Sequence, residues 1–180
     1  MNTDIDEKTL RENKLYEGRI ISLYVDDVLL PNGEKGTREY VSHRGGAAIL
    51  PVDEDGNVYL VRQFRYPYRE EILEIPAGKL EKGEEFYSTA VRELEEETGM
   101  KASKMTFLGV LYPTPGYTNE HLYVYLATEL TKGKAHLDED EFVGIVKMPF
   151  DEVCEMVMNN RIKDAKTCYA VLRYALEMHK

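Results

Sequence analysis

The chain has 180 residues, enough for one domain with a hydrophobic core, and its 43% hydrophobic and 31% charged residues are typical of a globular protein. The net charge of −10 argues against a general binder of nucleic acid or membrane surfaces. An anionic substrate would therefore need local cations or metal ions. No apolar run approaches the roughly 18 residues that span a bilayer, and the N-terminus MNTDIDEKTL is too polar for a secretory signal. We expect a cytoplasmic protein whose two cysteines, Cys154 and Cys168, stay reduced.

The first part of the chain predicts a small sheet. Residues 1–13 are predicted to form a frayed or loosely docked arm. Apolar and alternating patterns then predict strands over residues 16–22, 23–30 and 37–43, with a turn at Pro31-Asn32-Gly33. A hairpin sheet of this size is not stable alone. It should therefore pack on the rest of the chain or on a second subunit. We divide the chain into residues 1–44, an N-terminal arm and dimerisation sheet, and residues 45–180, the main domain.

The main domain is predicted to contain several strands, then a helix, then further strands and two terminal helices. Strands are predicted over residues 47–52, 58–64, 71–75, 105–112, 122–128 and 142–148, and helices over residues 151–159 and 165–178. A further helical pattern lies within residues 78–100. This order of elements predicts an α+β fold.

The segment from Gly78 to Met100 carries the strongest functional pattern. A mostly apolar stripe recurs at helical spacing, formed by Tyr87, Ala90, Val91, Leu94 and Thr98. At ~100° per residue, Glu93 and Glu97 lie about 40° apart at the edge of this stripe. Glu96 lies roughly 60° further out than Glu93, and Glu95 lies on the opposite flank.

Two carboxylates one turn apart repel each other, and a bound cation removes that cost. Oxygen ligands on a stiff helix suit Mg²⁺, and Mn²⁺ can substitute. The alternative interpretation is a solvated charged face, which is the usual explanation of a glutamate-rich helix. The full spacing favours the metal site, with specified residues at Gly78, Glu84, Arg92, Glu93, Leu94, Glu96, Glu97, Gly99 and Met100.

This spacing resembles the signature of the Nudix hydrolase family without a departure. The resemblance implies an α/β/α sandwich in which a mixed sheet packs between helices, with the N-terminal antiparallel hairpin sheet added. It also implies that Glu93 and Glu97 are the principal metal ligands. Glu96 would be a further ligand or support, and the backbone carbonyl of Ala77 would also contact a metal. Arg92 would orient the carboxylates, together with Glu84.

A general base is expected outside the motif, because glutamates that hold metal are poor bases. The acidic run 138–141 precedes the strand predicted over residues 142–148. In the ADP-ribose pyrophosphatases of this family, a glutamate on the loop before this strand supports the attacking water. Glu141 matches that position best and Glu139 second. The alternative is that this run is a solvated loop.

The loop 113–120 bears on the substrate. Pro115 lies sixteen residues after Gly99, and a proline at that distance is characteristic of family members that act on ADP-ribose. Thr114 replaces the usual serine of the Ser-Pro-Gly setting. Proline stiffens the turn and Gly116 permits close approach. Glu120 is a candidate contact for a ribose hydroxyl, or an exposed strand start.

Substrate phosphates need positive partners. The segment VRQFRYP contains Arg62 and Arg65, and the resemblance favours Arg65 as the diphosphate contact. Related enzymes contact adenine through the partner subunit's N-terminal sheet, so Arg38, Tyr40 and Arg44 are candidate contacts in a homodimer. Each of these residues taken singly is also compatible with an ordinary surface position.

The resemblance therefore predicts Mg²⁺-dependent hydrolysis of ADP-ribose to AMP and ribose 5-phosphate by a homodimer. One alternative is the same chemistry on another nucleoside diphosphate sugar, such as a GDP- or UDP-hexose. A second is a nucleotide-sensing domain without catalysis, which the complete set of glutamates in the motif disfavours.

Overall fold

The computed structural model describes residues 5–136 and 142–178. The chain divides into two compact units, which are described separately. The first contains Met1–Gly45 and Thr114–Glu120, and the second contains Gly46–Pro113 and His121–Lys180. The first unit therefore combines the N-terminal segment with a loop that lies far along the chain.

The first unit is built around strand β3 (Ser22–Leu29). Strand β4 (Lys35–Ser42) pairs with β3 along one edge. On the other edge, β1 (Lys8–Arg11) and β2 (Lys14–Glu17) follow one another, and all pairings are antiparallel. The expectation of a loose arm over residues 1–13 is thus wrong for β1. All four of its residues are exposed, so the strand lacks the alternating apolar pattern that would have indicated it.

The second unit contains a mixed sheet in the order β8-β5-β10-β9. Its strands are β5 (Gly46–Pro51), β8 (Ala77–Lys79), β9 (Met100–Leu111) and β10 (Leu122–Lys132). The pair β5 and β10 is parallel, and the other pairs are antiparallel. Strand β8 was not expected because three residues carry no readable alternation. Strand β9 begins five residues earlier than predicted.

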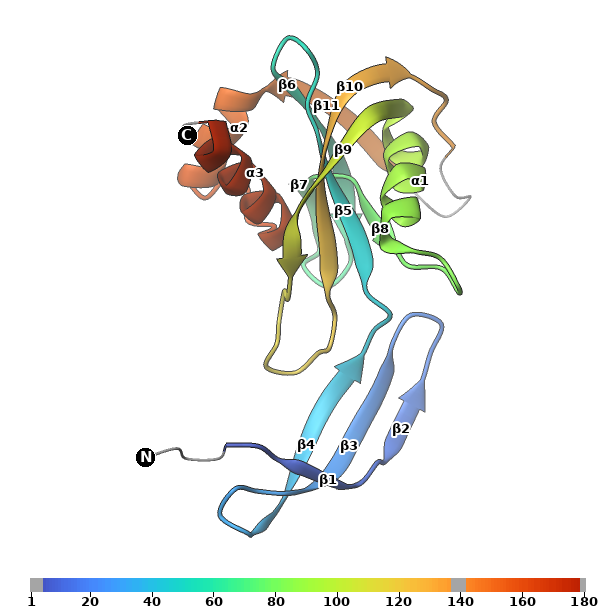
Figure 1. Ribbon diagram of the computed structural model, residues 1–180, viewed down its shortest axis with the longest axis vertical. Helices are drawn as coiled ribbons and strands as arrows, with labels where there is room; N and C mark the ends of the chain where they lie inside the picture. The colour runs from blue at the N-terminus through green and yellow to red at the C-terminus, as the bar shows by residue number, and fades with distance from the viewer. Residues whose placement is uncertain (1–4, 137–141, 179–180) are drawn as a thin grey trace. The chain divides into compact units, whose positions relative to one another are not determined.

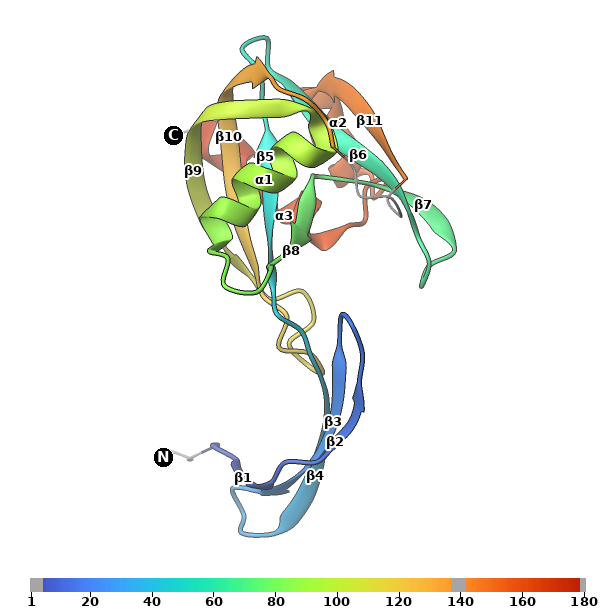
Figure 2. The same ribbon diagram turned by 90° about the vertical axis from the view of Figure 1, so that its right-hand side faces the viewer.

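An antiparallel sheet in the order β11-β6-β7 lies in the same unit (Figure 2). Its strands are β6 (Asn57–Arg65), β7 (Glu70–Glu74) and β11 (Val143–Pro149). The helices are α1 (Phe86–Thr98), α2 (Phe150–Met158) and α3 (Ala165–Met178). Figure 1 shows α1 on one side of the mixed sheet, with α2 and α3 on the other. No helix among the described residues is long and apolar enough to cross a membrane.

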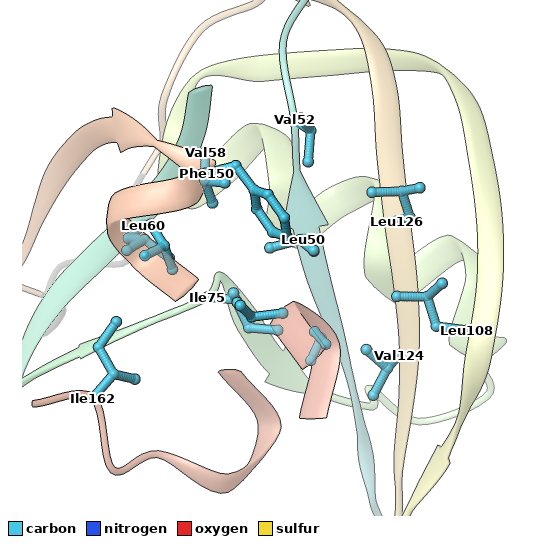
Figure 3. Close-up of a cluster of buried hydrophobic side chains, with 14 residues drawn as sticks. Leu50, Val52, Val58, Leu60, Ile75, Leu108, Val124, Leu126, Phe150 and Ile162 are labelled. Atoms are coloured by element: carbon cyan, nitrogen blue, oxygen red, sulfur yellow. The ribbon is translucent and has the colours of Figure 1, made fainter. Parts of the chain in front are cut away.

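Alternation along β5 explains this layering. Ala47 and Ile49 pack with Ala90 and Leu94 of α1. The neighbouring positions point the other way, where Leu50 joins a larger core with residues of β6, α2 and α3 (Figure 3). Because both faces of β5 are buried, the strand is an apolar run. The predicted α/β/α sandwich with a mixed sheet is confirmed.

Candidate active site

Helix α1 buries three members of the predicted stripe, Ala90, Leu94 and Thr98, together with its acidic edge. Tyr87 is 53% exposed and Val91 is 43% exposed, so both predicted core positions are wrong. Glu93 is only 8% exposed and Glu97 4%. The buried positions of the helix are Thr89, Ala90, Glu93, Leu94, Glu97 and Thr98. The buried face is therefore centred closer to Glu93 and Glu97, which the prediction placed at the edge of the stripe, than to Tyr87 and Val91.

The Glu93 carboxylate lies directly against the backbone of Gly78. A Cβ atom added at Gly78 would be 1.7 Å from Glu93 Oε1. A Cβ atom at Gly46, in the neighbouring strand β5, would be 2.3 Å from the Gly78 carbonyl oxygen. The absence of a side chain at Gly46 lets β5 and β8 approach closely, and its absence at Gly78 lets the Glu93 carboxylate reach the β8 backbone.

Glu97 approaches the adjacent residue of the same strand. The backbone N–H of Ala77 donates a hydrogen bond to Glu97 Oε2 at 2.9 Å. Strand β8 thus presents Ala77 to Glu97 and Gly78 to Glu93. Helix α1 ends directly after these acids, where Gly99 adopts the left-handed conformation at φ 67°.

Arg92 contacts three carboxylates, those of Glu93 and Glu96 on α1 and that of Glu84, which precedes the helix. Its Nε and Nη2 atoms donate to the two oxygens of Glu84 at 3.0 Å. Its Nη1 atom donates to Glu93 at 2.8 Å and to Glu96 at 2.7 Å. Hydrogen bonding to Arg92 lowers the pKa of Glu84 to about 2. The same acids raise the pKa of Arg92, the bond to Glu84 contributing most. Arg92 thus ties Glu84 and Glu96 to Glu93.

The donor set fits a divalent cation. Burial of two carboxylates one turn apart is costly, and hard oxygen donors of this kind suit Mg²⁺ or Mn²⁺. Within the described residues, no three or more His, Cys, Asp or Glu side chains are grouped closely enough to hold a metal. The backbone of Ala77, which contacts Glu97 through its N–H, would have to supply a further oxygen.

Arg65, at the end of β6, points toward a buried acid. Its Nε and Nη2 atoms donate to the two oxygens of Glu74 at 2.7 and 2.9 Å. Burial lowers the pKa of Arg65, but the hydrogen bonds and charge of Glu74, with the charges of Asp164 and Glu97, outweigh burial and raise it. Arg62 lies three positions earlier on the strand, which places it on the opposite face, and it is exposed.

Three candidate contacts lie on or after β4 in the first unit. Arg38 is ion-paired with Glu7, and its Nε donates to Glu7 Oε2 at 2.8 Å. Tyr40 is stacked on Tyr24 with ring centroids 4.9 Å apart. Arg44 is exposed. The guanidinium of Arg38 and one face of the Tyr40 ring thus have partners within their own sheet.

The loop with Pro115 is attached to the end of β4. The N–H of Val41 donates to the Tyr117 carbonyl at 2.8 Å. Pro115 and Gly116 are exposed in a turn, and a Cβ atom at Gly116 would meet nothing within 4 Å. Glu120 Oε1 lies 3.6 Å from His43 Nδ1. Pro115, Gly116 and Glu120 therefore share one unit with Arg38, Tyr40 and Arg44.

The candidate bases Glu139 and Glu141 lie outside the described residues. Sequence reasoning missed three residues that contact this region: Gly46, Glu74 and Lys166. Gly46 had a signal, because a glycine opening an apolar strand suggests close backbone approach. Glu74 had a weaker signal, as a single acid between Leu73 and Ile75. Lys166 had no signal, because a lysine near a helix start usually faces solvent.

The family model of the NUDIX domain matches residues 42–170, and that of the nucleoside diphosphate sugar hydrolase N-terminal domain matches residues 7–41. The chain is similar to the ADP-ribose pyrophosphatase of Bacillus subtilis, 45% identical over 98% of both chains. It is 43% identical to the methanol dehydrogenase activator of Bacillus methanolicus, covering 92% of this chain and 91% of that one. A solved structure of an ADP compounds hydrolase matches with a TM-score of 0.81 and 23% identity, covering 97% of this chain and 96% of that one. This last likeness concerns the fold.

Proposed function

Because the chain belongs to the Nudix hydrolase family, we propose that it hydrolyses the diphosphate of ADP-ribose to AMP and ribose 5-phosphate. The observation that carries this proposal is the buried pair Glu93 and Glu97, held against Gly78 and Ala77. The similarity to an ADP-ribose pyrophosphatase over nearly its whole length supports ADP-ribose as the substrate, and so does the position of Pro115.

The proposed reaction is attack of water on one phosphorus of the diphosphate. Glu93, Glu97 and the Ala77 carbonyl would hold Mg²⁺, with Glu96 supporting them and Arg92 orienting Glu93 and Glu96. A bound divalent cation neutralises charge at the phosphates and acidifies the attacking water. Arg65 binds the diphosphate through its positive charge. In this proposal four charged residues of α1 serve the metal ion, and Arg65 serves the substrate.

We propose Glu141 as the group that takes the proton of the attacking water, with Glu139 as the alternative. Both precede β11 in the chain. Glu141→Gln should lower kcat by about 10²-fold and leave KM much closer to wild type, as loss of a general base does. Steady-state kinetics on both Gln variants decide the assignment. A kcat that falls only in Glu139→Gln moves the role to Glu139.

The first unit is proposed to supply recognition of the nucleoside. Arg38, Tyr40, Arg44, Pro115 and Glu120 belong to this unit. Aromatic and guanidinium groups suit stacking on a base, and a carboxylate suits a ribose hydroxyl. Its match to a nucleoside diphosphate sugar hydrolase N-terminal domain supports the same role. Substitutions here should change the preference among substrates more than they change kcat.

The homodimer is also a proposal. Among the described residues of the first unit, Val28 is the one buried hydrophobic residue. Several large hydrophobics of this unit are exposed, namely Ile5, Leu10, Leu15, Tyr16, Ile20 and Ile21. A small sheet with so little core needs a covering surface. A second copy of the chain provides one, and we propose that it does.

A cytoplasmic setting belongs with this proposal. Cys154 and Cys168 are free thiols. Burial raises the pKa of both thiols, so they are poorly reactive at neutral pH. Free and unreactive cysteines are compatible with a reducing compartment.

The second candidate is the same chemistry on another nucleoside diphosphate sugar, with which the N-terminal family match is equally compatible. A panel of ADP-ribose, a GDP-hexose and a UDP-hexose with Mg²⁺, with products identified by mass in ¹⁸O-water, separates the two. The proposal predicts AMP and ribose 5-phosphate as the dominant products, with ¹⁸O in one of them. Faster cleavage of a hexose compound would shift the assignment. Cleavage of none would contradict hydrolysis altogether.

A further inference from the structure

A buried ionic cluster lies behind Arg65. At its centre is Glu74, whose side chain is 2% exposed, whereas that of Arg65 is 39% exposed. Lys166, from the start of α3, donates from Nζ to Glu74 Oε2, although the two residues are 92 positions apart in the chain. The same oxygen accepts Arg65 Nη2 at 2.9 Å. Glu74 is therefore held between one cation that faces inward and another that reaches the surface.

The cluster is completed by Asp164. Its Oδ1 accepts from Lys166 Nζ at 3.0 Å, which balances two acids with two bases. Its Oδ2 accepts from the Thr167 N–H at 2.9 Å and hydroxyl at 2.6 Å, which caps the start of α3. The ammonium group of the buried Lys166 therefore has two carboxylate partners, Glu74 and the helix-capping Asp164.

The start of α3 is also bound to the segment that leads to the metal site. The N–H of Ile75 donates to Thr167 Oγ1 at 2.8 Å. Two residues later, the Ala77 N–H donates to Glu97. The chain from Glu74 to Ala77 therefore connects the ionic cluster to the proposed metal ligands. A shift of Lys166 would be transmitted to Arg65 through Glu74, which accepts hydrogen bonds from both residues.

The geometry leaves part of Arg65 available. A guanidinium has five N–H groups, and its paired contact with Glu74 uses one on Nε and one on Nη2. Among the described residues no hydrogen bond is seen from the other three groups, and 39% of this side chain, whose orientation is already set by Glu74, is exposed. Anchoring of this kind reduces the entropy that substrate binding must offset.

We propose that Lys166 is a positioning residue for substrate binding: it holds Glu74, which holds Arg65 with free N–H groups for the diphosphate. This inference rests on the proposed function, in which Arg65 contacts the substrate. Neither Lys166 nor Glu74 contacts the substrate itself. Their effect is therefore carried by Arg65, and that dependence can be measured.

Lys166→Gln removes the charge of Lys166 and keeps a donor for Glu74. With ADP-ribose and Mg²⁺, we expect KM to rise roughly tenfold or more, because hydrogen bonds to charged groups are involved. The kcat should change by less than about threefold, as for a loss of uniform binding. Lys166→Arg should restore a KM near that of wild type. Lys163→Gln is the matched control, since Lys163 is an exposed lysine three positions earlier.

The decisive measurement repeats Lys166→Gln in an Arg65→Ala background. If Lys166 acts through Arg65, the second substitution adds almost nothing to KM. An equal effect in both backgrounds, or a wild-type KM in Lys166→Gln, overturns the positioning role. If Lys166→Gln does not fold by circular dichroism, the charge-balanced Glu74→Gln/Lys166→Gln variant replaces it. It should show the same rise in KM, and a wild-type KM there also overturns the role. A wild-type enzyme without activity on ADP-ribose instead refutes the proposed function.

Discussion

At the scale of single residues, close approach decides the identity of Gly78. The carboxylate of Glu93 occupies the space where any side chain at Gly78 would begin. The glycine is therefore required by the neighbouring acid rather than by its own backbone conformation. This is a physical reason for a glycine at the first position of the motif.

Gly78→Ala should displace Glu93 and lower kcat/KM for ADP-ribose by about 10²-fold or more, because the catalytic geometry tolerates little misplacement. Circular dichroism should show that the helices remain. Gly144→Ala is the control, since a Cβ atom there would meet its nearest neighbour at 3.9 Å. Near-normal activity in Gly78→Ala would contradict the placement of Glu93.

Glu84 makes a prediction about pH. Its pKa falls from an ordinary value of 4.5 to about 2 through Arg92. Because the folded pKa is the lower one, the stabilisation is fully present above the unfolded value and is lost as pH falls toward 2. The difference in unfolding free energy between wild type and Glu84→Gln should therefore shrink below about pH 4.5.

Urea denaturation from pH 7 to pH 2 measures this difference. Glu54→Gln is the control, because Glu54 is an exposed acid in the hairpin before β6. A difference between wild type and Glu84→Gln that is constant over this range would show that Arg92 does not depress the pKa of Glu84.

At the scale of elements, strand β9 carries a bulge that accommodates α3. The pairing with β10 shifts between Val124 and Tyr125, and Gly109 adopts φ 147° beside the shift. Tyr169 of α3 donates from its hydroxyl to the Leu108 carbonyl at 3.2 Å. A Cβ atom at Gly109 would be 2.2 Å from that hydroxyl. The bulge and the tyrosine therefore depend on each other.

Gly109→Ala should lower the unfolding free energy by about 1–3 kcal/mol through overpacking and backbone strain. Tyr169→Phe alone should cost about 1 kcal/mol, the value of one hydrogen bond. The double variant should be less destabilised than the sum, because Phe lacks the clashing oxygen. Strict additivity in urea denaturation would exclude a contact between the two positions.

The elements also show what could be predicted from sequence. The buried strand β5 and helix α2 were readable, because their apolar patterns match their burial. The bounds of α3 were also predicted, although Leu172 and Leu176 of its apolar pattern are exposed. The exposed strand β1 and the short β8 were not, because neither has an apolar face. In α1 the motif spacing identified the acids, and periodicity identified the buried Ala90, Leu94 and Thr98 but wrongly included Tyr87 and Val91. The ionic cluster of Glu74 and Lys166 was unreadable, since it joins positions 92 residues apart.

At the scale of the whole molecule, the chain combines one unit with an extensive core and one with almost none. The second unit buries a large set of apolar side chains on both faces of its mixed sheet. The first unit buries Val28 among its described hydrophobic residues and exposes Leu15 and Ile20. Such an imbalance is expected when a partner surface completes the smaller unit.

Ile20→Asp should therefore weaken the proposed dimer, because it would place a charge in the apolar interface that we propose. Sedimentation equilibrium should show a shift toward monomer of at least about tenfold in the dissociation constant. Met158→Asp is the control, since Met158 is an exposed residue of α2 in the other unit. A wild-type protein that is monomeric and active on ADP-ribose would contradict the homodimer.

The most direct test of the central claim compares Glu97→Gln with Glu95→Gln. The two substitutions remove equal charge from α1 at positions two residues apart, but Glu97 is buried beside Ala77, whereas Glu95 pairs with Lys101. We predict that Glu97→Gln lowers the Mg²⁺-dependent release of AMP from ADP-ribose by about 10²-fold or more. Glu95→Gln should retain nearly full activity. Near-normal release of AMP by a folded Glu97→Gln variant would contradict the metal-ligand role of the motif.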